Sequence, residues 1–103
     1  MTKILAVIND FLLSVKTDTI LKNHGFKLEY LKEDTNLEDY DIVLVDLSDN
    51  RAFEIIELVP DKCVAFGSHI DVELLNKAKE VGCNKVMARS KFFEDLPSLV
   101  NEN

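Results

Sequence analysis

Two uninterrupted runs of aliphatic residues, each closed by an aspartate, constrain this 103-residue chain more than any other feature. The first run is Ile4–Ile8, followed by Asn9 and Asp10, and the second is Ile42–Val45, followed directly by Asp46. A continuous Val, Ile and Leu run is typical of a strand buried on both faces of a parallel sheet. In an open α/β sheet, ligands bind outside the carboxyl ends of the strands. We therefore expect the two aspartates to share one crevice, where they would attract a divalent cation.

Strand-like and helix-like segments alternate along the chain. The strands are predicted at Lys3–Ile8, Phe26–Leu31, Asp41–Leu47, Cys63–Phe66 and Lys85–Ala88. The helices are predicted from Asp10 or Phe11 to His24, from Arg51 to Val59, and from Ile70 to Val81 with Ile70 in the buried stripe. The tail is predicted as a turn through Lys91–Asp95 and a short helix from Leu96, because Pro97 suits a first helical turn.

These segments predict an α/β fold with three layers. The polar stretch between the second and third strands is too short for more than one or two helical turns. Right-handed crossovers then favour an open parallel five-stranded sheet of the flavodoxin-like order 2-1-3-4-5, with shortened second and third helices. That order makes the first and third strands neighbours and brings Asp10 and Asp46 together.

Composition limits the classes of function. The length predicts a single domain over residues 1–103. The net charge of −7, with scattered lysines, argues against nucleic-acid binding through a basic surface. The apolar runs are too short to span a bilayer and no cleavable signal opens the chain, so we expect no membrane association and a cytoplasmic protein. Cys63 and Cys83 match neither a redox nor a zinc motif and are expected to be reduced, partly buried thiols.

The order and spacing of the segments resemble the CheY-like receiver domain of bacterial response regulators over nearly the whole chain. The matching segments are Val7–Phe11, Asp41–Leu47, Val64–Ser68 and Gly82–Arg89. The resemblance implies that Asp46 is the phosphoacceptor candidate and Asp10 the second, metal-contacting acid. It also implies Mg²⁺ as the ion, held by Asp10, Asp46 and a backbone carbonyl near Ser48, since Mg²⁺ binds one or two carboxylates plus water and phosphate oxygens.

Three of the chain's departures from the receiver pattern bear directly on the phosphate and metal contacts. Asn9 replaces the first acid of the family's pair, which removes a charge from the metal site. Gly67 falls on the Thr or Ser position, with Ser68 one residue late, so the hydroxyl that follows the phosphoryl group is lost. Arg89 replaces the Lys and keeps its charge with a different reach and geometry. Ser68 and Arg89 are therefore the phosphate-contact candidates.

The same residues could instead have purely structural roles. Asp10 suits the N-cap of the first helix. Ser68 and Asp71 resemble a capping box at the start of the helix predicted from Ile70. Arg89 would form an internal ion pair with Asp46, which would imitate occupancy of the site without any phosphate.

The resulting functional hypothesis is a stand-alone receiver-like signalling domain that acts by protein–protein contact, with impaired or no phosphorylation switching. The expected partner is a histidine kinase or a downstream effector, and the expected state is a monomer or weak homodimer. Enzyme activity is not expected, because no nucleophile–base pair can be assembled from these residues. One alternative is a working receiver that takes a phosphoryl group on Asp46 with Mg²⁺, and another is a small-molecule or nucleotide-binding module.

The resemblance also indicates a face for partner binding formed by the fourth helix, fifth strand and fifth helix of the family. The candidate residues on this face are Lys77, Lys79, Lys85, Met87, Phe92 and Phe93. Phe92 and Phe93 are predicted core residues that cover the last strand, and would mark a partner surface only if exposed.

Overall fold

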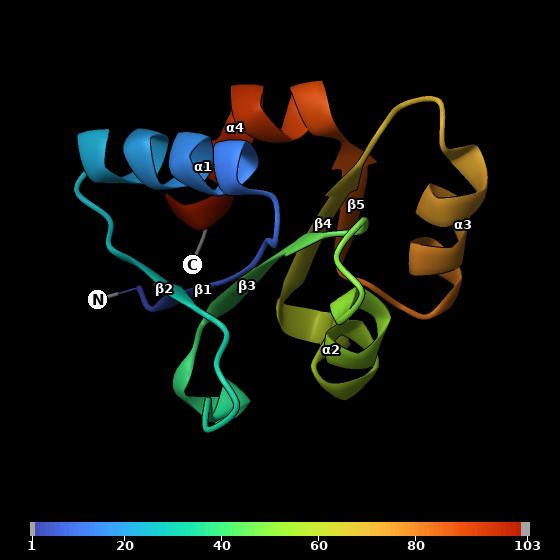
Figure 1. The fold of residues 1–103 in the computed structure, drawn as a ribbon, viewed down its shortest axis with the longest axis horizontal. Helices are drawn as coiled ribbons and strands as arrows, with labels where there is room; N and C mark the ends of the chain where they lie inside the picture. The colour runs from blue at the N-terminus through green and yellow to red at the C-terminus, as the bar shows by residue number, and fades with distance from the viewer. Residues whose placement is uncertain (1, 102–103) are drawn as a thin grey trace.

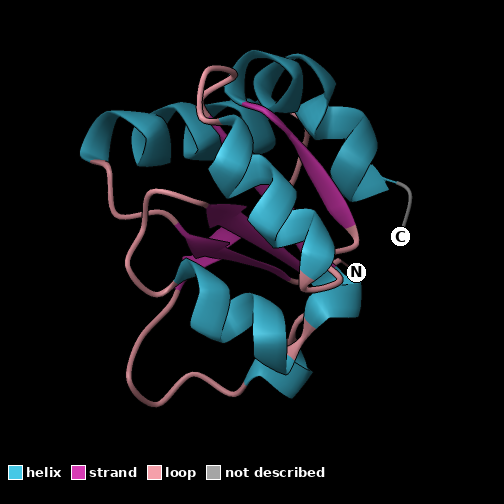
Figure 2. Cartoon of the chain, turned by 90° about the vertical axis from the view of Figure 1, so that its right-hand side faces the viewer, coloured by secondary structure: helices cyan, strands magenta, loops and turns pink. Residues whose placement is uncertain are grey.

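The computed structural model describes residues 2–101, which form a parallel five-stranded sheet with helices on both faces (Figure 1, Figure 2). The strands are β1 (Ile4–Val7), β2 (Leu28–Tyr30), β3 (Ile42–Asp46), β4 (Cys63–Gly67) and β5 (Lys85–Ala88). The helices are α1 (Phe11–Asn23), α2 (Ala52–Leu58), α3 (Val72–Glu80) and α4 (Arg89–Asn101). The strand order β2-β1-β3-β4-β5 confirms the predicted flavodoxin-like sheet. No helix within residues 2–101 is long and apolar enough to cross a bilayer.

The connection between β2 and β3 is as short as predicted. It contains a single 3-10 turn, η1 (Leu37–Asp39), in place of a second α-helix, and α2 has only 7 residues. The two shortened elements leave a groove of about 510 Å³ between them. Its apolar lining includes Leu31, Ile55 and Leu58, and Leu58 is 62% exposed.

Alternate residues of the central strands point to opposite faces of the sheet. In β1, Ile4 and Ala6 belong to the apolar cluster that includes residues of α1 and α4. Leu5 and Val7 belong to the second cluster, with residues of α2 and α3. Because both faces are covered by helices, both sets of side chains must be apolar, and the strand reads as one continuous aliphatic run.

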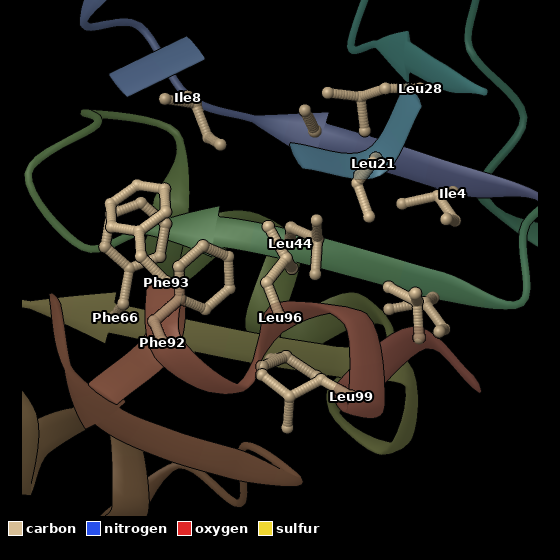
Figure 3. Packing of buried hydrophobic residues seen from close by; sticks show 14 residues of the cluster. Ile4, Ile8, Leu21, Leu28, Leu44, Phe66, Phe92, Phe93, Leu96 and Leu99 are labelled. Atoms are coloured by element: carbon tan, nitrogen blue, oxygen red, sulfur yellow. The ribbon is translucent and has the colours of Figure 1, made fainter. Parts of the chain in front are cut away.

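Three phenylalanines fill the core between the sheet and α4 (Figure 3). Phe66 of β4 stacks on Phe92 of α4 with ring centroids 4.2 Å apart, and it contacts Phe93 at 5.7 Å. Phe92 and Phe93 also meet edge to face at 5.1 Å. The expectation that these two residues belong to the core is confirmed.

The prediction for the tail was wrong, because α4 is continuous from Arg89 to Asn101 with Pro97 inside it. The residues that α4 buries are Phe92, Phe93, Leu96, Leu99 and Val100. A proline inside a helix costs about 3 kcal/mol. Each large apolar side chain contributes roughly 1.5–3 kcal/mol when fully buried. The apolar face of α4 therefore outweighs the break that Pro97 alone would cause.

The start of α3 also differs from the prediction. The helix begins at Val72, and the Asp71 carboxylate caps it by accepting a hydrogen bond from the Leu74 N–H at 3.3 Å. The Ser68 carbonyl accepts from the Asp71 N–H at 3.0 Å, which holds the preceding residues in a turn. Ile70 lies in that turn and is 79% exposed, so its assignment to the buried stripe was wrong.

The two cysteines lie at the amino ends of β4 and β5. Cys63 is buried, Cys83 is half-buried, and both are free thiols. Burial, followed by the neighbouring Cys83, raises the pKa of Cys63 to about 12. This thiol therefore stays protonated and behaves as a small apolar core residue.

The aromatic core yields a stability prediction. Replacing the fully buried Phe92 by alanine should lower the free energy of unfolding by about 3–5 kcal/mol, because the substitution leaves a cavity between the Phe66 and Phe93 rings. Phe11→Ala is the matched control, since Phe11 is 77% exposed and its loss should change stability by no more than about 0.5 kcal/mol. Chemical denaturation of the two variants measures the difference, and equal losses would contradict this description of the core.

Candidate functional site

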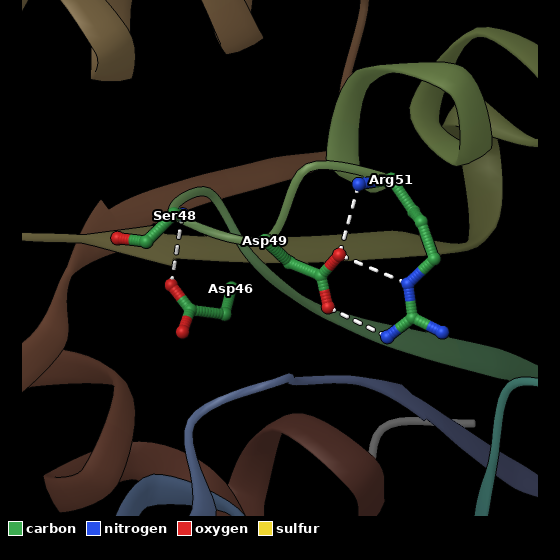
Figure 4. A network of polar contacts seen from close by, with 4 residues as sticks. All are labelled: Asp46, Ser48, Asp49 and Arg51. Atoms are coloured by element: carbon green, nitrogen blue, oxygen red, sulfur yellow. Dashed lines mark hydrogen bonds and ion pairs between the residues drawn. The ribbon is translucent and has the colours of Figure 1, made fainter.

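Asp46 ends β3 at the carboxyl edge of the sheet. The register pairs it with Phe66 of β4, and pairs Gly67 of β4 with Ala88 of β5. Asp46 is only 2% exposed, and its Oδ1 accepts a hydrogen bond from the Ser48 backbone N–H at 2.9 Å (Figure 4). The predicted phosphoacceptor is therefore a buried carboxylate in a tight turn.

Burial raises the pKa of Asp46 above the ordinary value for aspartate. Hydrogen bonds from Ser48 and the attraction of Arg89 oppose this effect, and the nearby Asp49 adds to it. The balance favours the neutral carboxyl more than water does, because removing a charge from solvent outweighs the two stabilising contacts.

Buried Asp49 and partly exposed Arg51 form a second polar feature beside Asp46, which the sequence analysis missed. Asp49 Oδ1 accepts from the Arg51 backbone N–H at 2.8 Å and from its Nε at 3.0 Å. Asp49 Oδ2 lies 2.7 Å from Arg51 Nη2, which completes a two-pronged ion pair (Figure 4). Burial alone would raise the pKa of Asp49, but the hydrogen bonds and charge of Arg51 hold it below the ordinary value. An aspartate whose carboxylate accepts from the backbone N–H two residues on is typical of a turn, but this preference does not predict the ion pair.

Asp10 is the N-cap of α1, which confirms the structural role predicted for it. Its Oδ1 accepts from the Leu13 N–H at 3.0 Å, and the residue is exposed. The register pairs Val7 of β1 with Val45 of β3, so Asp10 and Asp46 follow neighbouring strands. Within residues 2–101, no three His, Cys, Asp or Glu side chains gather in an arrangement that would hold a metal ion. Magnesium binding by Asp10, Asp46 and the backbone near Ser48 stays a prediction.

Gly67 stands where the receiver pattern has a hydroxyl, and leucines surround it. A Cβ added at Gly67 would lie 3.4 Å from Leu75 Cδ2 and 3.5 Å from Leu47 Cδ1. Both distances are ordinary van der Waals contacts, and Gly67 does not have the positive φ that Gly25 and Gly82 have. Neither its backbone nor its space therefore demands glycine, although its surroundings are apolar.

Ser68 and Arg89 directly follow the carboxyl ends of β4 and β5. The Ser68 hydroxyl accepts only a long 3.4 Å hydrogen bond from the Ile70 N–H, and Asp71 caps α3 in its place. Arg89 begins α4, and its Nε is buried without a hydrogen-bond partner among the described residues. The structure shows no ion pair between Arg89 and Asp46. The guanidinium acts on Asp46 only as a nearby charge.

The fold that carries these residues is similar to solved structures of known proteins. No family model and no curated protein matches the chain. A response regulator from Thermotoga maritima superposes with a TM-score of 0.70 at 14% identity, covering 99% of this chain and 97% of that one. An orphan response regulator of H. pylori superposes with a TM-score of 0.69 at 18% identity, covering 98% and 94%. The chain has the receiver fold of response regulators.

Within this receiver fold, the residues proposed for partner binding divide into two groups. Lys77 and Lys79 are exposed on α3, with the Lys77 ammonium 4.2 Å above the Phe53 ring. Met87 packs against the core, and Phe92 and Phe93 are buried in it. The two phenylalanines are therefore not available as a partner surface.

A group of exposed apolar side chains lies instead on the first turns of α1. Phe11 is 77%, Leu12 76% and Val15 45% exposed. Phe11 and Val15 are four residues apart and so share one side of the helix, with Leu12 beside them. The sequence gives no sign of this exposure, since apolar residues at helical spacing usually face the core.

Alanine at Gly67 should be tolerated in this receiver fold. We expect Gly67→Ala to leave the free energy of unfolding unchanged or to raise it by up to about 1 kcal/mol, because the added methyl fits and restricts the unfolded chain. Gly82→Ala is the matched control, and its φ of 89° should make the same change cost about 1–2 kcal/mol. Thermal and urea unfolding of both variants test the pair, and a loss at Gly67 as large as at Gly82 would refute the description of this position.

The opposed pKa shifts of Asp46 and Asp49 predict opposite pH effects. The folded state holds the Asp46 proton more tightly than the unfolded chain, so its contribution to stability falls as pH rises from the ordinary aspartate value through the raised pKa. Asp46→Asn should remove this fall and stabilise the protein at neutral pH by about 1 kcal/mol.

The depressed pKa of Asp49 gives stability above the unfolded value that is lost as pH falls through the folded value. Asp49→Asn should therefore destabilise the protein at neutral pH, by about 1–3 kcal/mol, and weaken its loss of stability in acid. Unfolding free energies measured across the acid range check both variants. The electrostatic description fails if Asp46→Asn is the less stable of the two at neutral pH.

Proposed function

We propose that this chain is a receiver-fold signalling domain that acts by binding a protein partner and does not use a phosphorylation switch. The observation that carries the proposal is Gly67 between Leu47 and Leu75. A receiver switches when a hydroxyl at this position moves toward the new phosphoryl group. Here the position offers no donor, and two leucine side chains occupy the space beside it.

The acidic side of the site supports the same proposal. Asn9 brings no charge, Asp10 is engaged at the N-cap of α1, and Asp46 is buried with a raised pKa. A magnesium ion needs ionised carboxylates facing one another with room for water ligands. The arrangement therefore offers a weaker attraction to Mg²⁺ than a complete acidic pair would.

The exposed side chains of α1 support binding to a protein. Phe11, Leu12 and Val15 present adjacent apolar surface at the carboxyl edge of the sheet, close in sequence to Asp10. Exposed apolar groups gathered on one helix face are costly in water and often mark a contact surface. A histidine kinase or a downstream effector is the class of partner that the receiver fold suggests.

Incubation with acetyl phosphate tests the proposal directly. Intact mass measured with and without Mg²⁺ should show no phosphoryl adduct, because Asp46 is buried and the metal site lacks an acid. Asp46→Asn and Asp49→Asn are the matched variants, since they separate an adduct on the phosphoacceptor candidate from one on the neighbouring aspartate.

A Mg²⁺-dependent adduct that disappears in Asp46→Asn and persists in Asp49→Asn would overturn the proposal. The chain would then be a working phosphoacceptor despite Gly67 and Arg89. An adduct insensitive to both substitutions would be nonspecific and would leave no role for the edge of β3.

A further inference from the structure

The groove of about 510 Å³ lies on the face of the sheet that α2 and α3 cover. Its two walls are α2 and the segment that contains η1, which lie on the same side of the sheet (Figure 1). The connection from β2 to β3 crosses this face without an α-helix, so the layer of helices is incomplete at this point. The groove therefore occupies the place that a helix of this connection would fill.

Apolar side chains of both walls make the groove self-complementary. Leu31 and Leu37 come from the wall that contains η1, and Ile55 and Leu58 come from α2. Ile55 is 6% exposed and Leu58 is 62% exposed, so an apolar slot and a protruding apolar side chain lie next to each other. In a two-fold symmetric pair, Leu58 of each copy can enter the slot of the other copy, because the same patch is used twice.

The charges of the groove also suit a second copy. The wall that contains η1 contributes Lys32 and Glu33, and α2 contributes Arg51 and Glu54, so bases and acids are balanced. The whole chain, by contrast, has 19 acids and 12 bases. A two-fold interface brings each patch against its own copy, and an acid-rich patch would therefore repel itself. The balanced groove avoids this repulsion.

Two of these charges are available for contacts between copies. Lys32 and Glu54 are exposed and line the groove from opposite walls. Neither side chain forms an ion pair within residues 2–101, whereas Arg51 is paired with Asp49. When α2 of one copy lies against the groove of the other, Lys32 of each copy would meet Glu54 of the other copy. Two-fold symmetry forms both contacts together.

We infer that this groove is the interface of a two-fold symmetric homodimer in which Leu58 of each copy enters the groove of the other. Nine residues line the groove, fewer than the roughly 20–30 residues that each side of a standard interface contributes. The dimer should therefore be weak, with a dissociation constant on the order of 100 μM. The inference goes beyond the proposed function, because this face is separate from the exposed side chains of α1 and its use does not depend on Asp46.

Sedimentation equilibrium at several protein concentrations should show a reversible equilibrium between monomer and dimer. Leu58→Asp should weaken dimerisation by at least about tenfold, because a charge replaces the apolar side chain that fills the groove. Leu12→Asp is the matched control, since Leu12 is 76% exposed on α1 outside the groove, and it should leave the dissociation constant unchanged. Both leucines are exposed, and circular dichroism of the two variants checks that the fold is retained.

A charge exchange tests the contact between Lys32 and Glu54. Lys32→Glu and Glu54→Lys should each weaken dimerisation by about three- to tenfold, because like charges then meet at both contacts. An equimolar mixture of the two variants should dimerise at least as tightly as the unsubstituted chain, since both contacts then join opposite charges. Lys27→Glu mixed with Glu73→Lys is the matched control, because both residues are exposed outside the groove, and mixing should bring no such recovery.

A chain that stays monomeric at every concentration would overturn the inference, and a different protein or a small apolar molecule would then be the occupant to test. A dimer that Leu12→Asp disrupts and Leu58→Asp does not would also overturn it, because the copies would meet through α1. The same holds if the mixture of Lys32→Glu and Glu54→Lys is no tighter than the separate variants. These results are separate from the acetyl phosphate experiment, since a covalent adduct on Asp46 neither requires nor prevents association through the groove.

Discussion

The burial of β3 on both faces is the constraint on which the candidate site depends. Its residues pair with β1 on one side and β4 on the other, and Val43 and Leu44 are fully buried beneath opposite layers of helices. A shift of one residue would exchange the two faces, so the register is fixed by packing. The same register places Asp46 beside Phe66 at the end of the sheet, where its carboxylate loses contact with water. The chemistry of Asp46 is therefore set by the packing of its strand.

The edge of the sheet combines charges that are satisfied locally with charges that are not. Asp49 is neutralised by Arg51 within its own turn, and Asp10 is used by the backbone of α1. Arg89, by contrast, has neither an ion pair nor a hydrogen bond to Nε among the described residues. The buried side-chain group without a hydrogen-bond partner among the described residues is therefore part of a cation. The missing hydroxyl at Gly67 and the missing acid at Asn9 are the observations from which we propose a receiver fold that acts without covalent modification.

The sequence predicted the sheet because aliphatic runs such as Ile42–Val45 have few alternatives in a chain that alternates strands and helices. It failed at α4, where Pro97 argued locally for a break that the buried face of the helix overrides. It also failed at Ile70, whose exposure depends on Asp71 capping α3. The positions of Asp46 and Arg89 at the edge of the sheet followed from the strand order. The burial of Asp46, the lack of a partner for Arg89 Nε among the described residues and the Asp49–Arg51 ion pair depend on side-chain geometry, which the spacing of residues in the sequence does not encode.

The proposed absence of a phosphorylation switch can be tested by forming the phosphoryl mimic beryllofluoride in the presence of Mg²⁺ and recording backbone amide spectra. If Gly67 has lost the switch, amide shifts stay near Asp46 or do not occur at all, and residues of α3 and β5 are unaffected. Concerted shifts through Val72–Glu80 and Lys85–Ala88 that vanish in Asp46→Asn would show that the edge of β3 still controls the far side of the sheet, and would contradict the central claim.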